Sequence, residues 1–127
     1  MRRILLVDSD VESCTQLAHN LNMAGYSVDR AYSGAAAIDH LRIVGAGLVV
    51  LNVAMRQMDG WHVLNWINAQ SGANKPTVIV HSALPDSQWK LAKLHGASEL
   101  WVRGSCSFAA MCESLRECLE SKVASAA

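Results

Sequence analysis

The chain has 127 residues, of which 51% are hydrophobic and 17% are charged, and its 11 basic and 11 acidic residues give a formal net charge of zero at pH 7. This length predicts one domain. The balanced charge lacks the basic excess that contacts to nucleic-acid phosphates require, so we expect no nucleic-acid binding. A surface with few charges favours association, which points to a homodimer or to a protein partner.

No apolar run approaches the length of a membrane span, and the N-terminal run stops at Asp8, too early for a signal peptide. The four cysteines, at positions 14, 106, 112 and 118, have neither the paired spacing of metal ligands nor the pattern of a small disulfide-linked domain. The expectation is a soluble, cytoplasmic protein with reduced thiols, no bound metal and no membrane contact.

Short apolar runs alternate with helical patterns along the chain, which is typical of a doubly wound parallel sheet with helices on both faces. The first expected helix is capped by Asp10 and stopped by Gly25, the second lies between Ser33 and Gly45, and the third follows Gly60. The expected strands cover residues 4–7, 26–31, 48–51, 77–80 and 100–102.

The fourth expected helix has Pro85 in its first turn and ends before Gly96, and the fifth is capped by Ser107. Apolar side chains at helical spacing should face the sheet. They are Val11, Cys14, Leu17, Ala18 and Leu21, then Ile38, Leu41 and Val44, then Val63, Leu64 and Ile67, then Leu91 and Leu94, and last Phe108, Met111, Leu115 and Leu119. The domain should cover residues 1–123, with 124–127 as a frayed tail.

Polar residues follow or end four of the expected strands. The carboxyl ends of parallel strands meet at one edge of the sheet, where α/β proteins build their sites. The polar residues expected at this edge are Asp8, Ser9, Asn52, Ser82 and Arg103.

Motifs spread over nearly the whole chain match a known family. They are Val-Asp at 7–8, Met-Asp-Gly at 58–60, Ser-Ala at 82–83 and Gly-Ala at 96–97. With its five βα units, the chain resembles the receiver domain of bacterial two-component response regulators, the CheY-like family. The resemblance implies a flavodoxin-like fold with strand order 2-1-3-4-5. It also implies a pocket where two adjacent acids bind Mg²⁺, an Asp accepts a phosphoryl group from a histidine kinase, and a hydroxyl residue and a Lys complete the site.

This chain departs from the family at most of these positions. The two acids fall on Asp8 and Ser9, the phosphoacceptor on Asn52, the hydroxyl residue on Ser82 and the Lys on Arg103. A neutral amide is a very poor nucleophile, so Asn52 should not accept phosphate. Mg²⁺ prefers anionic oxygens, so its binding should be weak or absent. The pattern indicates a degenerate pocket, that of a pseudo-receiver.

The charges of this pocket differ from those of the family. Three carboxylates and one Lys are replaced by Asp8 and Arg103, whose charges cancel. A guanidinium pairs well with a carboxylate and stays charged when partly buried. We therefore predict a salt bridge between Arg103 and Asp8, with the amide of Asn52 close by.

Three large apolar residues are candidates for binding a protein partner. The aromatic switch residue of the family falls on Leu100, which has no polar tip to exchange between buried and exposed positions. Trp66 and Trp89 fall outside the inward positions of their helices, and tryptophan is common at interfaces. With Leu100 they form the candidate partner surface, which includes a homodimer through the fourth helix, fifth strand and fifth helix. His81 precedes Ser82, and strand alternation should point it away from the crevice.

The main hypothesis is an atypical receiver domain that is not phosphorylated, is not an enzyme, needs no cofactor and binds a signalling protein. One alternative is a regulator that senses a small molecule in the emptied crevice. A second is an enzyme that uses Asp8, Ser82 and Arg103, although a Ser without a neighbouring His base is poorly activated.

A third alternative is a conventional phospho-receiver in which Asn52 has replaced the acceptor Asp. A single replacement at residue 52 does not account for the other departures. These lie at Ser9, Arg56, Arg103 and Gly104.

Overall fold

Five strands and five helices alternate in the computed structural model, which describes residues 3–56, 59–71, 75–83 and 86–126. They are β1 (Arg3–Val7), α1 (Val11–Met23), β2 (Ser27–Ala31), α2 (Gly34–Ile43), β3 (Leu48–Leu51), α3 (Asp59–Asn68), β4 (Thr77–Ser82), α4 (Asp86–Leu94), β5 (Ala97–Val102) and α5 (Phe108–Ala126). Pro85, expected in the first turn of α4, lies outside the described residues. Among the described residues, no helix is both long and apolar enough to cross a bilayer.

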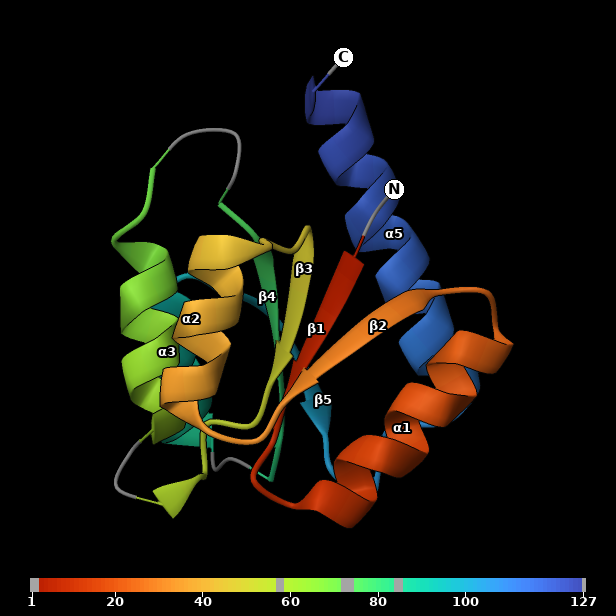
Figure 1. Cartoon of the computed structure of the whole chain (residues 1–127), viewed down its shortest axis with the longest axis horizontal. Coiled ribbons are helices and arrows are strands. Elements are labelled where there is room, and N and C mark those ends of the chain that lie inside the picture. The colour runs from red at the N-terminus through yellow and green to blue at the C-terminus, as the bar shows by residue number, and fades with distance from the viewer. Residues whose placement is uncertain (1–2, 57–58, 72–74, 84–85, 127) are drawn as a thin grey trace.

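All strand pairs are parallel, and the sheet order is β2-β1-β3-β4-β5. The predicted fold class and strand order are therefore confirmed. Helices α1 and α5 cover one face of the sheet, while α2, α3 and α4 cover the other (Figure 1). Because every strand pair is parallel, the carboxyl ends of the strands meet at one edge of the sheet, the lower edge in Figure 1.

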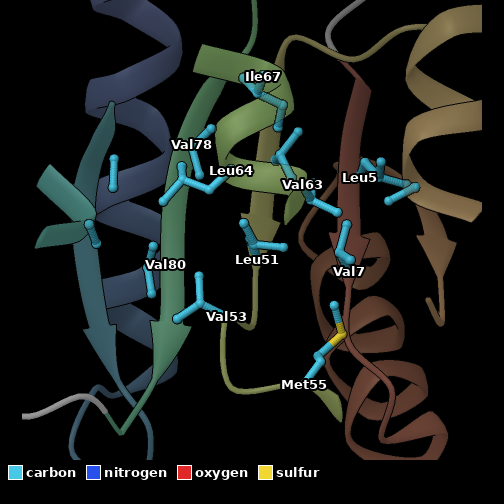
Figure 2. Close-up of a cluster of buried hydrophobic side chains, with 14 of the residues drawn as sticks. Leu5, Val7, Leu51, Val53, Met55, Val63, Leu64, Ile67, Val78 and Val80 are labelled. Atoms are coloured by element: carbon cyan, nitrogen blue, oxygen red, sulfur yellow. The ribbon is translucent and has the colours of Figure 1, made fainter. Parts of the chain in front are cut away.

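Two apolar layers fill the space between sheet and helices. Figure 2 shows the larger layer, where Leu5, Leu51 and Val80 from three strands pack against Val63 and Leu64 of α3. Alternate residues of the same strands point into the second layer, against α1 and α5. Strand β3 is buried along its whole length, as its uninterrupted apolar run predicts for a central parallel strand.

Some elements begin or end away from their expected positions. Strand β4 continues through His81 to Ser82, and β5 begins three residues earlier, at Ala97. Helix α3 begins at Asp59, so Gly60 lies inside the helix instead of before it. Helix α5 extends through Ala126, and the assignment of 124–127 to a separate tail stays a prediction.

Five side chains that were expected to face the sheet are exposed, so those assignments were wrong. On α4, Ala92 is buried and Trp89 packs against the core. The face of α4 that meets the sheet is therefore rotated away from Leu91 and Leu94. The others lie in the first or last turn of a helix or just beyond it, where the chain reaches past the sheet. The exposed fractions are Val11 53%, Val44 50%, Leu91 45%, Leu94 81% and Phe108 38%.

Candidate functional site

The candidate site lies at the carboxyl edge of the sheet, and strand register aligns its members. Leu51 of β3 pairs with Val7 of β1 on one side and with Val80 of β4 on the other. The next residue of each strand is therefore at one level, which puts Asp8, Asn52 and His81 side by side. All three line one small cavity on the α1 side of the sheet.

Asp8 is the buried charge of the site, with 7% of its surface exposed. Its Oδ1 accepts a hydrogen bond from Asn52 Nδ2 at 3.1 Å and another from the backbone N–H of Asp10 at 3.0 Å. Its Oδ2 accepts from Arg103 Nη2 at 2.6 Å. Each carboxylate oxygen is held by at least one donor from the chain itself, and the ionic bond is short, as expected for a charge-assisted pair.

The pairing of Arg103 with Asp8 is the contact that charge counting predicts. One guanidinium nitrogen makes the bond, so the two-bond fork geometry is not formed. The backbone N–H of Arg103 donates to the Ser82 carbonyl at 3.3 Å, which ties the residue to the end of β4. The Arg103 side chain is 33% exposed, against 10% for Asp8, so the cation covers the carboxylate from the solvent side.

Asn52 uses both ends of its amide within the chain. Its Nδ2 donates to Asp8, and its Oδ1 accepts from the backbone N–H of Ala54 at 2.9 Å. The backbone N–H of Asn52 donates to the Val7 carbonyl at 2.9 Å. The amide group is therefore fixed between β1 and the loop that follows β3.

Ser9 and Ser82 lie apart from this network. Ser9 is exposed in the loop after β1. Ser82 is 2% exposed and points to the opposite face of β4 from His81. The next acid, Asp10, caps α1 by accepting from the backbone N–H and the hydroxyl of Ser13, and these bonds lower the pKa of Asp10. The Asp10 carboxylate therefore acts as the N-cap of α1 and not as a member of the Asp8 network.

His81 was expected to point away from the crevice, and this expectation was wrong. Alternation does turn it away from Ser82, but Asp8 and Asn52 face the same cavity as His81. The imidazole meets the indole of Trp101 edge to face, with ring centres 6.1 Å apart. Burial, and next the positive charge of Arg103, lower the pKa of His81, so the ring is neutral at pH 7.

Cys14 also lines this cavity, from α1. Burial, with a smaller contribution from the negative charge of Asp8, raises the pKa of its thiol to about 11. A thiol with such a pKa is protonated at neutral pH and is a weak nucleophile. The cavity has a volume of about 20 Å³, which is room for about one water molecule. Among the described residues, no group of three or more His, Cys, Asp or Glu is placed to hold a metal ion.

The three residues of the candidate partner surface do not lie together. Trp66, Trp89 and Leu100 are all partly buried and pack against the larger apolar layer. Trp89 and Leu100 line one hollow beside β5, whereas Trp66 lines another between α2 and α3, near Pro76. Whether a partner contacts these residues stays a prediction.

Sequence reasoning misplaced one residue of interest and missed another. The misplaced residue is His81, which an alignment of strand ends would place level with Asp8 and Asn52. The missed residue is Glu99, a carboxylate inside a strand that also carries Leu100 and Trp101. A charged residue within a strand next to two large apolar side chains is the signal that could have found it.

An open parallel sheet with helices on both faces and polar residues at its carboxyl edge places this chain in the doubly wound α/β class. Solved structures share the fold. The CheY-like response regulator receiver domain protein from Methanospirillum hungatei JF-1 superposes with a TM-score of 0.87 over 98% of both chains at 17% identity. A two-component response regulator from Clostridium difficile gives 0.82 over 94% of this chain and 97% of that chain, at 21% identity.

The model of the response regulator receiver domain family matches residues 4–99, and the chain belongs to that family. The transcriptional regulatory protein ZraR of Salmonella typhimurium is 43% identical over 70 residues, which are 55% of this chain and 16% of ZraR. The response regulator MprA of Mycobacterium avium is 32% identical over 78 residues, which are 61% of this chain and 34% of MprA. The aligned part thus covers about a third or less of these relatives.

Proposed function

We propose that this chain is a receiver domain of a bacterial two-component system that works without phosphorylation at residue 52, docking in its unmodified state to a signalling protein in the cytoplasm. The observation that carries the proposal is the Asp8 carboxylate, which is held by Arg103, Asn52 and the backbone N–H of Asp10. The site is neutralised by its own residues, so it needs neither a metal ion nor a phosphoryl group to balance its charge.

The donor set fits Mg²⁺ poorly. This ion requires near-octahedral oxygen ligands, with at least one or two carboxylates free to coordinate. Asp8 is already paired with Arg103, and the carbonyl oxygen of Asn52 already accepts from Ala54. A metal ion would have to displace the guanidinium from its 2.6 Å contact. We therefore propose that the domain works without Mg²⁺.

Chemistry at residue 52 supports the same conclusion. A carboxylate can attack phosphorus and hold the product as an acyl phosphate, whereas an amide nitrogen or oxygen is a very poor nucleophile. Ser82 offers no substitute, because its side chain is buried and turned to the face of β4 opposite His81, away from that neutral imidazole. The cavity beside Asp8 has room for about one water molecule, so the small-molecule alternative gains no support from it.

Intact-mass spectrometry after incubation with acetyl phosphate and Mg²⁺ tests the proposal. The native chain should gain no phosphoryl adduct. A variant with Ser9→Asp, Asn52→Asp and Arg103→Lys restores the acids and the amine of the family pocket, and it should gain one adduct under the same conditions.

An adduct on the native chain would overturn the proposal and make the domain a working phospho-receiver with an unusual acceptor. The variant guards against a failed reaction, because it shares every other residue with the native chain. Peptide mapping of the variant should place its adduct on residue 52.

A further inference from the structure

A hollow lies at the amino-terminal edge of the sheet, the edge opposite to Asp8. Helices α2 and α3 contact each other, and both end at this edge, the upper one in Figure 1, where β4 begins. The hollow between these helix ends and the start of β4 has a volume of about 470 Å³. This volume is within the range of small-molecule sites.

One wall of the hollow is apolar. Leu41, Ala46 and Trp66 pack against the larger apolar layer and also line the hollow. Pro76, just before β4, adds its ring to the same wall. A half-buried indole beside a proline ring gains most from contact with another flat ring, so this wall favours a planar, ring-containing molecule.

The charged residues of the lining are Arg42 and Lys75, and none of the described residues that line the hollow is acidic. Arg42 pairs with Asp39, outside the lining, at 3.8 Å, and both side chains are mostly exposed. A long, exposed pair of this kind is weak, so the guanidinium can turn toward a ligand. Lys75 Nζ donates to the backbone carbonyl of Asn68 at 3.2 Å and to its side-chain oxygen at 3.3 Å, which holds the ammonium at the end of α3.

The two helix ends determine which kind of anion suits the hollow. Each helix C-terminus carries about half a negative charge, and α2 and α3 end here at Ile43 and Asn68. The full positive charges of Arg42 and Lys75 outweigh these partial charges. A phosphate dianion is better served by a helix N-terminus, where N–H groups donate to it. The modest positive charge of this hollow therefore suits the single charge of a carboxylate.

We propose that this hollow, the Trp66 hollow, binds a small aromatic carboxylic acid. Its ring lies against Trp66 and Pro76, and its carboxylate accepts charge-assisted hydrogen bonds from the guanidinium of Arg42. The ammonium of Lys75 adds to the attraction. The inference concerns the opposite edge of the sheet from Asp8, and it does not depend on the proposed function.

An NMR titration with 2-naphthoate tests the Trp66 hollow directly. The indole N–H signal of Trp66 and the amide signals of residues 41–46 and 70–71 should shift together as the probe is added. The indole signals of Trp89 and Trp101 should stay in place, and Trp66→Phe identifies the Trp66 signal by its loss.

Two analogues of the probe separate the contribution of its charge from that of its ring. The neutral 2-naphthamide has almost the same shape and should bind at least about tenfold more weakly, because it loses the charge-assisted bonds. The dianionic 2-naphthyl phosphate should bind no more tightly than 2-naphthoate, because both helix ends oppose its second charge.

Matched variants separate a site from general charge attraction. Arg42→Gln should weaken the binding of 2-naphthoate at least about fivefold. Arg116→Gln removes the same charge from an exposed position of α5, on the other face of the sheet, and should leave binding unchanged. If Arg42→Gln changes the spectrum of the free protein, Lys75→Gln provides the second variant and should also weaken binding.

The absence of any shift at Trp66 with millimolar 2-naphthoate would overturn the inference. Equal binding of 2-naphthoate and 2-naphthamide, equal binding by the Arg42 and Arg116 variants, or tighter binding of the phosphate would overturn it too. None of these results depends on residue 52, so failure of the Trp66 hollow and failure of the phosphorylation proposal are distinguishable.

Discussion

At the scale of single residues, the site is governed by one buried carboxylate and the donors around it. A buried charge is tolerated when it is paired and hydrogen-bonded, and Asp8 has an ion pair, a side-chain amide and a backbone N–H. Arg103 is 95 residues away in sequence, so the pair also fastens the end of β1 to the loop after β5. Stability and the altered chemistry of the pocket therefore depend on the same contacts.

Removing the Arg103 cation should leave the buried Asp8 carboxylate without its ion-pair partner and so lower the stability of the fold. We expect Arg103→Met to lower the free energy of unfolding by about 1–3 kcal/mol, because an unpaired buried charge is costly but a third of Arg103 is exposed to water. Urea unfolding measures the change. In the double variant with Asp8→Asn the charge is gone, so most of the loss should be recovered.

Arg42→Met is the matched control for this substitution. Arg42 pairs with Asp39 at 3.8 Å, and both side chains are about two-thirds exposed, at 65% and 69%. Its removal should change the stability by less than about 0.5 kcal/mol. Equal losses in the Arg42 and Arg103 variants, or no recovery in the double variant, would show that the buried pair has no special role.

The sequence predicted these residues unevenly, and the reasons are physical. Charge counting was enough to pair Arg103 with Asp8, because a low-charge crevice has few ways to neutralise a carboxylate. His81 was misplaced because alternation within β4 gives a side chain's face only relative to its own strand. Register between strands decides which residues share that face, and Val80 lies opposite Leu51.

At the scale of the elements, a close contact of backbones joins β3 to α3. Gly60, in the first turn of α3, lies so near the chain after β3 that an added Cβ would be 2.4 Å from the Asn52 carbonyl oxygen and 2.3 Å from Val53 Cα. Backbone atoms cannot give way cheaply. The missing side chain of Gly60 therefore sets the position of the loop that carries Asn52.

Gly60→Ala should be strongly destabilising. We expect a loss of about 3 kcal/mol or more in the free energy of unfolding, because the methyl group overlaps backbone that other contacts hold in place. Thermal or urea unfolding measures the loss.

Gly47→Ala is the control, because its added Cβ would meet only the Arg3 carbonyl oxygen, at an ordinary distance of 3.8 Å. If the two alanine variants were equally stable, the close approach at Gly60 would not constrain the loop.

Element prediction succeeded where one signal dominated. The uniformly apolar β3 and the capped helices α1 and α2 were located well, because burial and N-capping by Asp10 and Ser33 agree. The position of helix α4 was predicted correctly, but the face that it turns to the sheet was not. Leu91 and Leu94 suggested one face, whereas Trp89 and Ala92 lie on the face that packs against the sheet. In β5, Ala97 pairs with Val78 and Glu99 with Ile79, so Ser98 is an extra residue between the two pairs. Nothing in a single sequence signals this irregularity, so the direction of Glu99 could not be predicted.

At the scale of the whole molecule, strand register places residues of β1, β3, β4 and β5 level with one another, so that contacts continue from the site across the sheet. Asp8, Asn52 and His81 are level with one another, and His81 pairs with Trp101 of β5. Trp101 in turn donates to Ser114, which donates to Glu99. A row of polar and aromatic groups thus runs from Asp8 at the carboxyl edge to Glu99 of β5, and His81 lies between these two carboxylates.

This position of His81 predicts how the stability of the domain depends on pH. Burial and Arg103 lower the pKa of His81 below its ordinary value of 6.5, and the opposing effect of Asp8 is smaller. Below pH 6.5 the unfolded chain therefore takes up a proton that the folded chain resists, which favours unfolding. Stability should fall as the pH is lowered from 7.5 to 5.5, and His81→Gln should flatten that fall.

Urea unfolding of both proteins at several pH values gives the comparison, and an NMR titration of the imidazole gives the pKa of His81 independently. Glu99 acts in the opposite direction, because its raised pKa makes the folded chain hold a proton more tightly above pH 4.5. That contribution is present in both proteins and cancels in their difference. A fall that is as steep in the glutamine variant as in the native chain, or a measured His81 pKa above 6.5, would contradict burial beside Arg103 as the cause.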